Sequence, residues 1–285
     1  MNNVAEQWNE QAFIEELLSD LESGRLVLPT LPDVALRVRD AVEDENASAS
    51  NIAKAVSTDA ALSARLLQVA NSPLYRPRTP VDNLQTAIAR LGQKQIQNLV
   101  ISLVMQQMFQ ATDEVLEVRL RGLWEHNVEV AAICHVLASA IPVLQSDQAL
   151  MAGLVHDIGI LPILVRAEEV HELLDHPELL DSVTSKLHTQ IGAHILKQWS
   201  FPETLVHVVQ EHENMAYDHD GNADYTDLVI VANLKSHAGT DHALASVDWS
   251  GVSAFERLGL DTEMEVIIMD ENLGQVEEIQ EMLGG

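Results

Sequence analysis

A histidine and an aspartate, His156 and Asp157, stand side by side in the strongly apolar segment of residues 153–160. An imidazole nitrogen and a carboxylate oxygen are both common ligands of divalent metal ions. A metal ion held by such a pair lowers the pKa of a bound water molecule and thereby supplies a nucleophile for hydrolysis. The pair therefore raises the hypothesis of a metal centre, with iron, manganese or magnesium as candidate ions.

Further ligands for such an ion must come from other segments of the chain. Neighbouring residues on a helix point about 100° apart, so the pair alone cannot surround an ion. The candidates are His126, His188 and His212, because histidines on separate helices can converge in the core of a bundle. All twelve histidines follow residue 112. Four of the others stand in polar surroundings and are predicted to lie at the surface: His171, His176, His237 and His242.

The elements that carry these residues are predicted to be helices. Apolar residues recur three and four apart along almost the whole chain, whereas alternating β-branched runs are almost absent. One helix is expected over residues 11–22, and another over 149–160 with the His-Asp pair inside it. We predict an all-α fold in which about five short N-terminal helices pack on a second helical bundle that carries the histidines.

The polar segment of residues 110–114 is the best boundary between the two halves. We divide the chain into an N-terminal helix (1–21), an N-terminal helical half (22–112), a histidine-bearing half (113–245) and a C-terminal tail (246–285). Residues 261–285 contain eight acidic side chains and no basic one, with apolar residues at helical spacing. This pattern predicts an acidic amphipathic helix that covers an apolar groove of its own subunit or contacts another protein, and we favour the first.

Composition excludes several classes of partner. The 16 basic and 44 acidic residues give a net charge of −28, which repels nucleic acids and anionic lipid surfaces. The single cysteine, Cys134, has no intramolecular disulfide partner and fits a reducing compartment. The N-terminus lacks the features of a signal peptide, and no run of about 18 apolar residues is evident. We therefore expect a cytoplasmic protein that binds neither nucleic acid nor membrane.

Several short motifs follow one another in a defined order along both halves. The first half contains Leu28-Pro29, Leu31-Pro32, Asp59, Leu66-Leu67, Ala70-Asn71-Ser72, Tyr75, Ala87 and Leu91-Gly92. The second half contains Trp124-Glu125-His126, Val130-Ala131, the segment 153–159, His188, Ile191-Gly192-Ala193, Trp199, Pro202 and Glu211-His212-Glu213. In this order the chain resembles the HDOD domain, a helical signalling module of bacteria that is related to the HD and HD-GYP phosphohydrolases. The resemblance extends from about residue 22 to 240.

The resemblance implies a specific set of metal ligands, and this chain departs from it. The minimal HD site consists of a histidine, a His-Asp pair and a distant aspartate, which correspond here to His126, His156, Asp157 and, in place of the aspartate, Asn233. An amide oxygen can bind Mg²⁺ or Mn²⁺ but adds no negative charge, so metal affinity should fall. The second-metal run of HD-GYP enzymes begins here with Glu211 instead of histidine, and the Gly-Tyr-Pro element is absent.

Three interpretations of this site stay open at this point. The residues are inherited packing groups without an ion, or they bind a metal without efficient hydrolysis, or they form a working phosphohydrolase. We favour a regulatory protein that acts mainly through an unidentified protein partner and has a degenerate metal site, with a homodimer as a further arrangement. The alternative is a metal-dependent phosphohydrolase for a nucleotide or cyclic dinucleotide, in which His156 and Asp157 would be the catalytic residues.

Overall fold

The computed structural model describes residues 10–44, 46–75, 79–109, 114–170, 176–260 and 265–284. These residues form helices, turns and loops without any strand, which confirms the predicted all-α class. The helices of the first half are α1 (Glu10–Glu22), α2 (Asp33–Glu43), α3 (Ala49–Val56), α4 (Ala60–Ala70), α5 (Leu84–Leu91) and α6 (Gln93–Met105). Those of the second half are α7 (Glu114–Ser139), α8 (Ser146–Val155), α9 (Ile160–Glu168), α11 (Pro177–Gln198), α12 (Glu203–Glu211), α13 (Tyr225–Ser236), α14 (Ser253–Leu258) and α15 (Glu265–Gly284).

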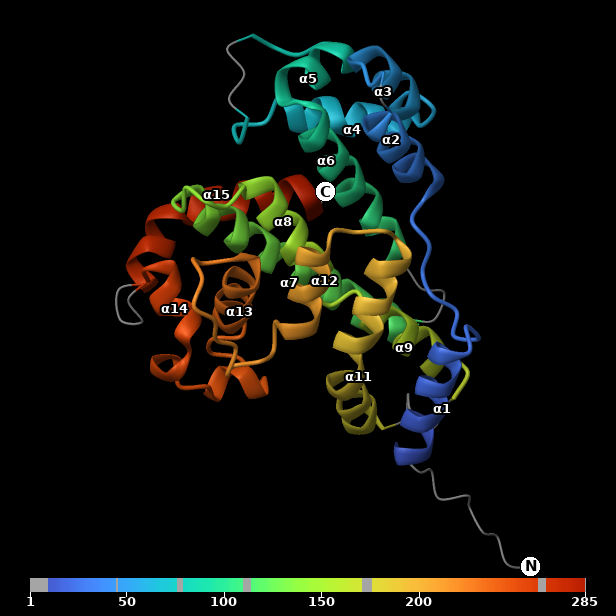
Figure 1. The fold of residues 1–285 in the computed structure, drawn as a ribbon, viewed down its shortest axis with the longest axis vertical. Helices are drawn as coiled ribbons and strands as arrows, with labels where there is room; N and C mark the ends of the chain where they lie inside the picture. The colour runs from blue at the N-terminus through green and yellow to red at the C-terminus, as the bar shows by residue number, and fades with distance from the viewer. Residues whose placement is uncertain are drawn as a thin grey trace, which may run out of the picture.

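Polar residues with short side chains begin three of the short N-terminal helices. Ser48, Asp59 and Asn83 precede α3, α4 and α5, and each accepts a hydrogen bond from a backbone N–H in the first turn. Such caps satisfy donors that the helix itself leaves free. Figure 1 shows α2 to α5 gathered at one end of the molecule, with α6 running from them toward the histidine-bearing half. The predicted arrangement of a short-helix bundle packed on a second bundle is therefore confirmed.

Two glycines allow close contact between backbones in the second half. A Cβ atom on Gly153 of α8 would lie 2.4 Å from the Cα atom of Ala131 on α7. A Cβ atom on Gly159, in the turn before α9, would lie 1.9 Å from the carbonyl oxygen of His188 on α11. Both distances are too short for any side chain. The glycines thus bring the segment around residue 156 against the two helices that carry His126 and His188.

The C-terminal helix α15 packs on its own chain, as we predicted. Val276, Ile279 and Leu283 are buried, and α15 lies against α7 (Figure 1). The Arg65 guanidinium of α4 donates hydrogen bonds to the carbonyl oxygens of Met282 and Leu283, which satisfies acceptors at the end of the helix. Leu273 is one of the apolar residues at helical spacing in this segment, but it is not buried with the others, because it is 48% exposed.

One segment of the described chain is long and apolar enough to cross a membrane, but it forms part of the core. This segment, Ser146–Glu168, comprises α8 and α9, and 83% of its most apolar window is buried within the fold. Its hydropathy is therefore explained by packing against neighbouring helices. The predicted boundary between residues 112 and 113 lies outside the described residues, so the division into four segments stays a prediction.

Candidate metal centre

The His-Asp pair lies in a turn between two helices. Helix α8 ends at Val155, residues 156–159 form the turn, and α9 begins at Ile160. The prediction that a helix continues through the pair was therefore wrong. The turn allows His156 and Asp157 to face the same point, which two neighbours within a regular helix could not do. The close approach of Gly159 to α11 holds this turn in place.

The first group of side chains joins this turn to α7. The Nε2 atoms of His126 and His156 lie 3.2 Å apart. The Oδ2 atom of Asp157 lies 3.4 Å from His156 Nε2 and 3.7 Å from His126 Nε2. Two imidazole nitrogens bound to one transition metal at about 2.1 Å are about 3.0 to 3.4 Å apart in octahedral or tetrahedral geometry. The two imidazole nitrogens are therefore spaced as ligands of one ion, and Asp157 Oδ2 lies close enough to join them.

The second group uses the other oxygen of the same carboxylate. Asp157 Oδ1 lies 3.2 Å from His212 Nε2 and 3.5 Å from His188 Nε2. The two imidazole Nε2 atoms are themselves 3.2 Å apart. Asp157 thus connects two three-residue groups, each able to hold one metal ion. A carboxylate shared between two ions is the arrangement of two-metal sites in hydrolytic enzymes.

The opposite nitrogen of each imidazole is fixed by a bond outside the centre. The Nδ1 atoms of His156, His188 and His212 lie 2.6, 2.9 and 3.0 Å from the carbonyl oxygens of Gly153, Thr184 and Val209. A carbonyl oxygen can only accept, so each Nδ1 must carry the proton and donate it. In the neutral imidazole the Nε2 atom then has a free lone pair that faces the centre. Metal-binding histidines are held in this way.

The tautomer of His126 decides whether the first group needs a cation. With the proton on Nε2, His126 would donate a hydrogen bond to His156 Nε2 at 3.2 Å. With the proton on Nδ1, toward the Ser236 hydroxyl, the two Nε2 lone pairs would repel each other unless one ring gains a second proton or a metal ion binds both. Burial lowers the pKa of His156 to about 3, and it also lowers the pKa of His126. Protonation is therefore unfavourable at neutral pH. A metal ion satisfies both nitrogens at once.

Protonation competes with a metal ion in the second group. Burial lowers the pKa of His212, but the hydrogen bond to Asp157 and the charge of that carboxylate outweigh burial and leave it raised. Burial would raise the pKa of Asp157, but His156, His188 and His212 together hold it well below its usual range. The carboxylate is thus ionised, and metal binding at this group would displace a proton from His212.

Asn233 lies beside the first group on the buried face of α13. Burial lowers the pKa of His126, and the neighbouring Asn233 amide acts in the opposite direction. Its Oδ1 atom is buried and accepts no hydrogen bond from the described residues. A buried acceptor without a partner costs about 1–3 kcal/mol, so the structure leaves this oxygen free for a ligand. An ion held by His126 and His156 would give this oxygen a partner.

The structure thus brings all six predicted site residues to one place: His126, His156, Asp157, His188, His212 and Asn233. Sequence reasoning missed two neighbours of the centre. Glu213 Oε2 lies 3.8 Å from His188 Nε2, at the outer edge of the second group. The Ser236 hydroxyl lies 3.4 Å from His126 Nδ1. The sequence signal for each was its position: Glu213 follows His212 directly, and Ser236 stands one helical turn after Asn233.

His237 was predicted as a surface residue, and this was wrong in part. Its half-buried ring stacks on His126 with centroids 4.7 Å apart, and burial lowers its pKa to about 4. His242 is exposed but stacks on His237 at 3.8 Å. His176 is exposed as predicted, and His171 lies outside the described residues. The two stacked rings extend the histidine cluster from the centre to the surface.

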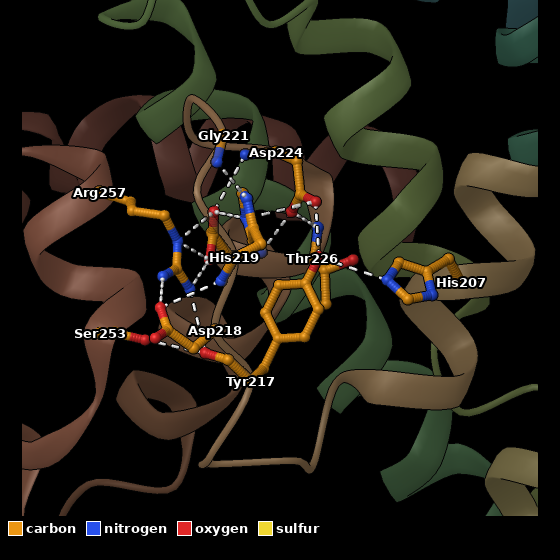
Figure 2. A network of polar contacts seen from close by, with 10 residues as sticks. His207, Tyr217, Asp218, His219, Gly221, Asp224, Thr226, Ser253 and Arg257 are labelled. Atoms are coloured by element: carbon orange, nitrogen blue, oxygen red, sulfur yellow. Dashed lines mark hydrogen bonds and ion pairs between the residues drawn. The ribbon is translucent and has the colours of Figure 1, made fainter.

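A second cluster of histidine and aspartate differs in its protonation (Figure 2). His219 Nδ1 accepts a hydrogen bond from the Gly221 backbone N–H at 3.1 Å, so in the neutral ring the proton is on Nε2. That Nε2 lies 3.3 Å from Asp227 Oδ2 and acts as a donor to it. Although His219, Asp224 and Asp227 are close enough to hold an ion, His219 does not present a free lone pair to them.

This cluster stabilises the beginning of α13 through hydrogen bonds and an ion pair. The buried Asp227 carboxylate accepts hydrogen bonds from Arg257 Nη2 at 2.7 Å and from its Nε at 3.0 Å. Asp224 caps the helix by accepting from the N–H groups of Thr226 and Asp227. The Arg257 side chain also lies over the ring of Tyr217. The cluster therefore orients α13, the helix that carries Asn233 into the metal centre.

This all-α chain, in which two histidine groups share one aspartate, has an HD-like helical fold. The family model of the HDOD domain matches residues 28–215. This chain is a member of the HDOD family.

Three relatives show how far the similarity extends. A crystal structure named "putative metal-dependent phosphohydrolase" from Shewanella amazonensis is 30% identical, with a TM-score of 0.83, over 96% of this chain and 99% of that one. An HDOD domain protein from Geobacter sulfurreducens shares the fold, with 21% identity, a TM-score of 0.65 and coverage of 96% and 98%. An uncharacterized protein from Treponema pallidum is 27% identical over 221 residues, which are 73% of this chain and 42% of that protein.

Proposed function

We propose that this protein is a regulatory HDOD protein that binds two divalent transition-metal ions at a centre bridged by Asp157. The observation that carries the proposal is the orientation of the histidines. His156, His188 and His212 donate from Nδ1 to backbone carbonyls, so their Nε2 atoms all face Asp157. Buried imidazole nitrogens that converge on one carboxylate in this way suit a divalent cation, which at the second group would replace the proton of His212.

The donor set favours iron or manganese over magnesium. His126, His156, Asp157 and Asn233 would hold the first ion, and His188, His212, Asp157 and Glu213 the second. Imidazole nitrogen suits iron and other transition metals, whereas Mg²⁺ prefers oxygen ligands and retains water. When bound, the ions would supply Lewis acidity and could activate a water molecule. The residues of the chain hold the ligands in place and exclude solvent, because His156, His188 and His212 are almost fully buried.

The way the centre joins the fold supports a regulatory role. Its ligands come from α7, the turn after α8, α11, the end of α12 and α13. An ion bound there would link five segments and stabilise their packing by its binding free energy. We propose that the resulting surface binds a protein partner, since the strongly acidic chain disfavours nucleic acids. The relatives share the fold, and none of them identifies that partner.

Metal analysis with paired histidine variants tests the centre. Protein purified without chelators should contain close to two equivalents of iron or manganese, and His188→Ala should lose the second ion. His194→Ala is the matched control, because His194 is an exposed residue of the same helix, α11. Metal added to chelator-treated protein should raise the melting temperature of the wild type and of His194→Ala, and less so that of His188→Ala. The proposal would be refuted if the purified protein contained no bound metal and its melting temperature did not change on addition of iron or manganese.

The alternative is a metal-dependent phosphohydrolase, and the shared carboxylate of Asp157 favours it specifically. Two ions joined by one carboxylate can stabilise both the attacking and the leaving oxygen of a phosphoester. The Shewanella amazonensis protein of similar fold carries that name. The assay is release of product from nucleotides and cyclic dinucleotides with Mn²⁺ or Fe²⁺. Activity that His156→Ala abolishes and His194→Ala retains would establish this function; metal binding without turnover would leave the regulatory role.

A further inference from the structure

The metal centre does not account for a cavity between the two halves of the protein. This cavity, of about 420 Å³, lies where the N-terminal half meets the histidine-bearing half. Residues of α2 and α6 line one side, and residues of α8, the turn after α11 and the start of α12 line the other. Its volume lies within the range of pockets that bind small molecules. We call it the interface pocket.

The interface pocket has two basic residues, Lys94 and Arg39, and one acidic residue, Glu43, in its lining, in a chain of net charge −28; Arg39 also lies 3.6 Å from Asp40. Lys94 is exposed and forms no ion pair with a described residue, and Arg39 lies across from the C-terminal end of α11. Helices α6, α8 and α12 all begin at this pocket, and none has a side-chain cap at Gly92, Gln145 or Pro202. Uncapped helix starts carry free N–H donors and partial positive charge, which attract an anion.

Gln97 provides an independent sign of a missing ligand. It is 9% exposed, it lines the interface pocket, and its side chain has no hydrogen-bond partner among the described residues. The amide atoms of Gln97 are not among the fully buried polar atoms that lack a partner, so solvent reaches them from the cavity, where there is room for a polar ligand. Asn98, Gln145 and Gln148 add three further amides to the lining. Amide side chains both donate and accept, which suits the edge of a heterocyclic ring.

Hydrogen bonds connect the two walls of the pocket. Arg39 Nη1 donates to the Trp199 carbonyl at 2.9 Å, and Trp199 Nε1 donates to the Pro29 carbonyl at 3.0 Å. These two bonds tie the N-terminal half to the end of α11. Ser200 follows with a φ of +58°, a left-handed conformation that is rare for residues other than glycine. Apolar residues such as Ile101, Met151 and Leu205 complete the lining.

We propose that the interface pocket binds a small ligand with a flat, hydrogen-bonding ring and one anionic group, the chemistry of a nucleoside monophosphate. Arg39, Lys94 and the helix starts bind the anionic group, and the amides around Gln97 bind the ring edge. The apolar residues contact the face of the ring. The site is separate from the metal centre, and its existence does not depend on the function proposed for that centre.

Calorimetric titration of the full chain with AMP, GMP, CMP, UMP and inorganic phosphate tests the proposal. At least one nucleotide should bind with 1:1 stoichiometry and more tightly than phosphate alone. Lys94→Gln, which changes an exposed residue without an ion pair, should weaken binding about tenfold, and Gln97→Leu should weaken it while raising the melting temperature. Arg90→Gln, on the exposed face of α5 outside the pocket, is the control and should bind normally.

Two results would overturn the assignment. One is the absence of binding of all four nucleotides at millimolar concentration, both to metal-free and to metal-loaded protein. The other is binding that Lys94→Gln and Gln97→Leu leave unchanged but His156→Ala abolishes, because the nucleotide would then occupy the metal centre. Binding that His156→Ala retains and Lys94→Gln weakens supports the interface pocket, whether or not the centre hydrolyses phosphoesters.

Discussion

Replacement of Gly159 by alanine should disrupt the metal centre without removing any ligand. The new Cβ atom would lie 1.9 Å from the His188 carbonyl oxygen, where real Cβ atoms keep at least 3.0 Å. The turn that carries His156 and Asp157 must therefore move by at least about 1.1 Å relative to α11. Metal sites tolerate errors of about 0.2 Å in ligand distance, so the second ion should bind at least about tenfold more weakly. Overpacking of this kind also costs about 1–3 kcal/mol of stability.

Metal content and urea denaturation of matched glycine variants measure both effects. Gly122→Ala is the control, because a Cβ atom there meets nothing within 4 Å, and a helical alanine should raise stability by about 0.4–1 kcal/mol. Gly192→Ala should lie between the two, because its Cβ atom would meet the movable Val209 Cγ1 at 2.6 Å. Circular dichroism confirms that each variant is folded. A Gly159→Ala variant that keeps the stability and metal content of the wild type would refute the expected clash with α11.

Three further predictions concern stability. The metal-free protein should lose stability as pH falls from 6.5 toward 3, by up to about 1.4 kcal/mol per pH unit. The reason is that the unfolded chain protonates His156 near pH 6.5, whereas the folded chain protonates it only near pH 3. Urea denaturation at several pH values, in the presence of a chelator, measures this loss. Arg257→Met should cost about 3–5 kcal/mol by leaving the buried Asp227 carboxylate without its guanidinium partner, with only His219 and the Asp224 N–H still bonded to it, and an unchanged denaturation midpoint would contradict this. Ser200→Gly should raise the stability by about 1 kcal/mol, since glycine adopts positive φ without strain; thermal unfolding decides.

The fold class and the site residues were predictable from the sequence for different reasons. Helical spacing of apolar residues depends only on local geometry, so the all-α class followed from it directly. The histidines of the centre followed from their types and from their order along the chain. The turn at residues 156–159 could not be predicted from spacing, because the apolar pattern continues across it from α8 into α9. What bends the chain there is the contact of Gly159 with α11, a tertiary interaction.

The tautomers of the histidines could be assigned only from the structure. The described residues form clusters of histidine and aspartate at two places, and residue types alone do not distinguish a metal centre from a cluster that only stabilises the fold. The distinction depends on what each Nδ1 atom contacts. A backbone carbonyl at His156 forces the proton onto Nδ1, whereas the Gly221 N–H at His219 forces it onto Nε2. The same pair of residue types thus offers a lone pair in one place and a donor in the other.

Helices α8 and α12 connect the interface pocket with the metal centre. Each begins at the pocket, next to Gln145 and Pro202, and each ends at a predicted metal ligand, His156 or His212. A ligand that shifts the beginning of either helix also shifts a ligand of the centre, because a helix of about ten residues moves nearly as a rigid body. By thermodynamic linkage, any factor by which the nucleotide changes metal affinity equals the factor by which metal changes nucleotide affinity. A measured difference in nucleotide affinity between metal-free and metal-loaded protein would therefore show that the two sites form one regulatory unit, and equal affinities would show that they act independently.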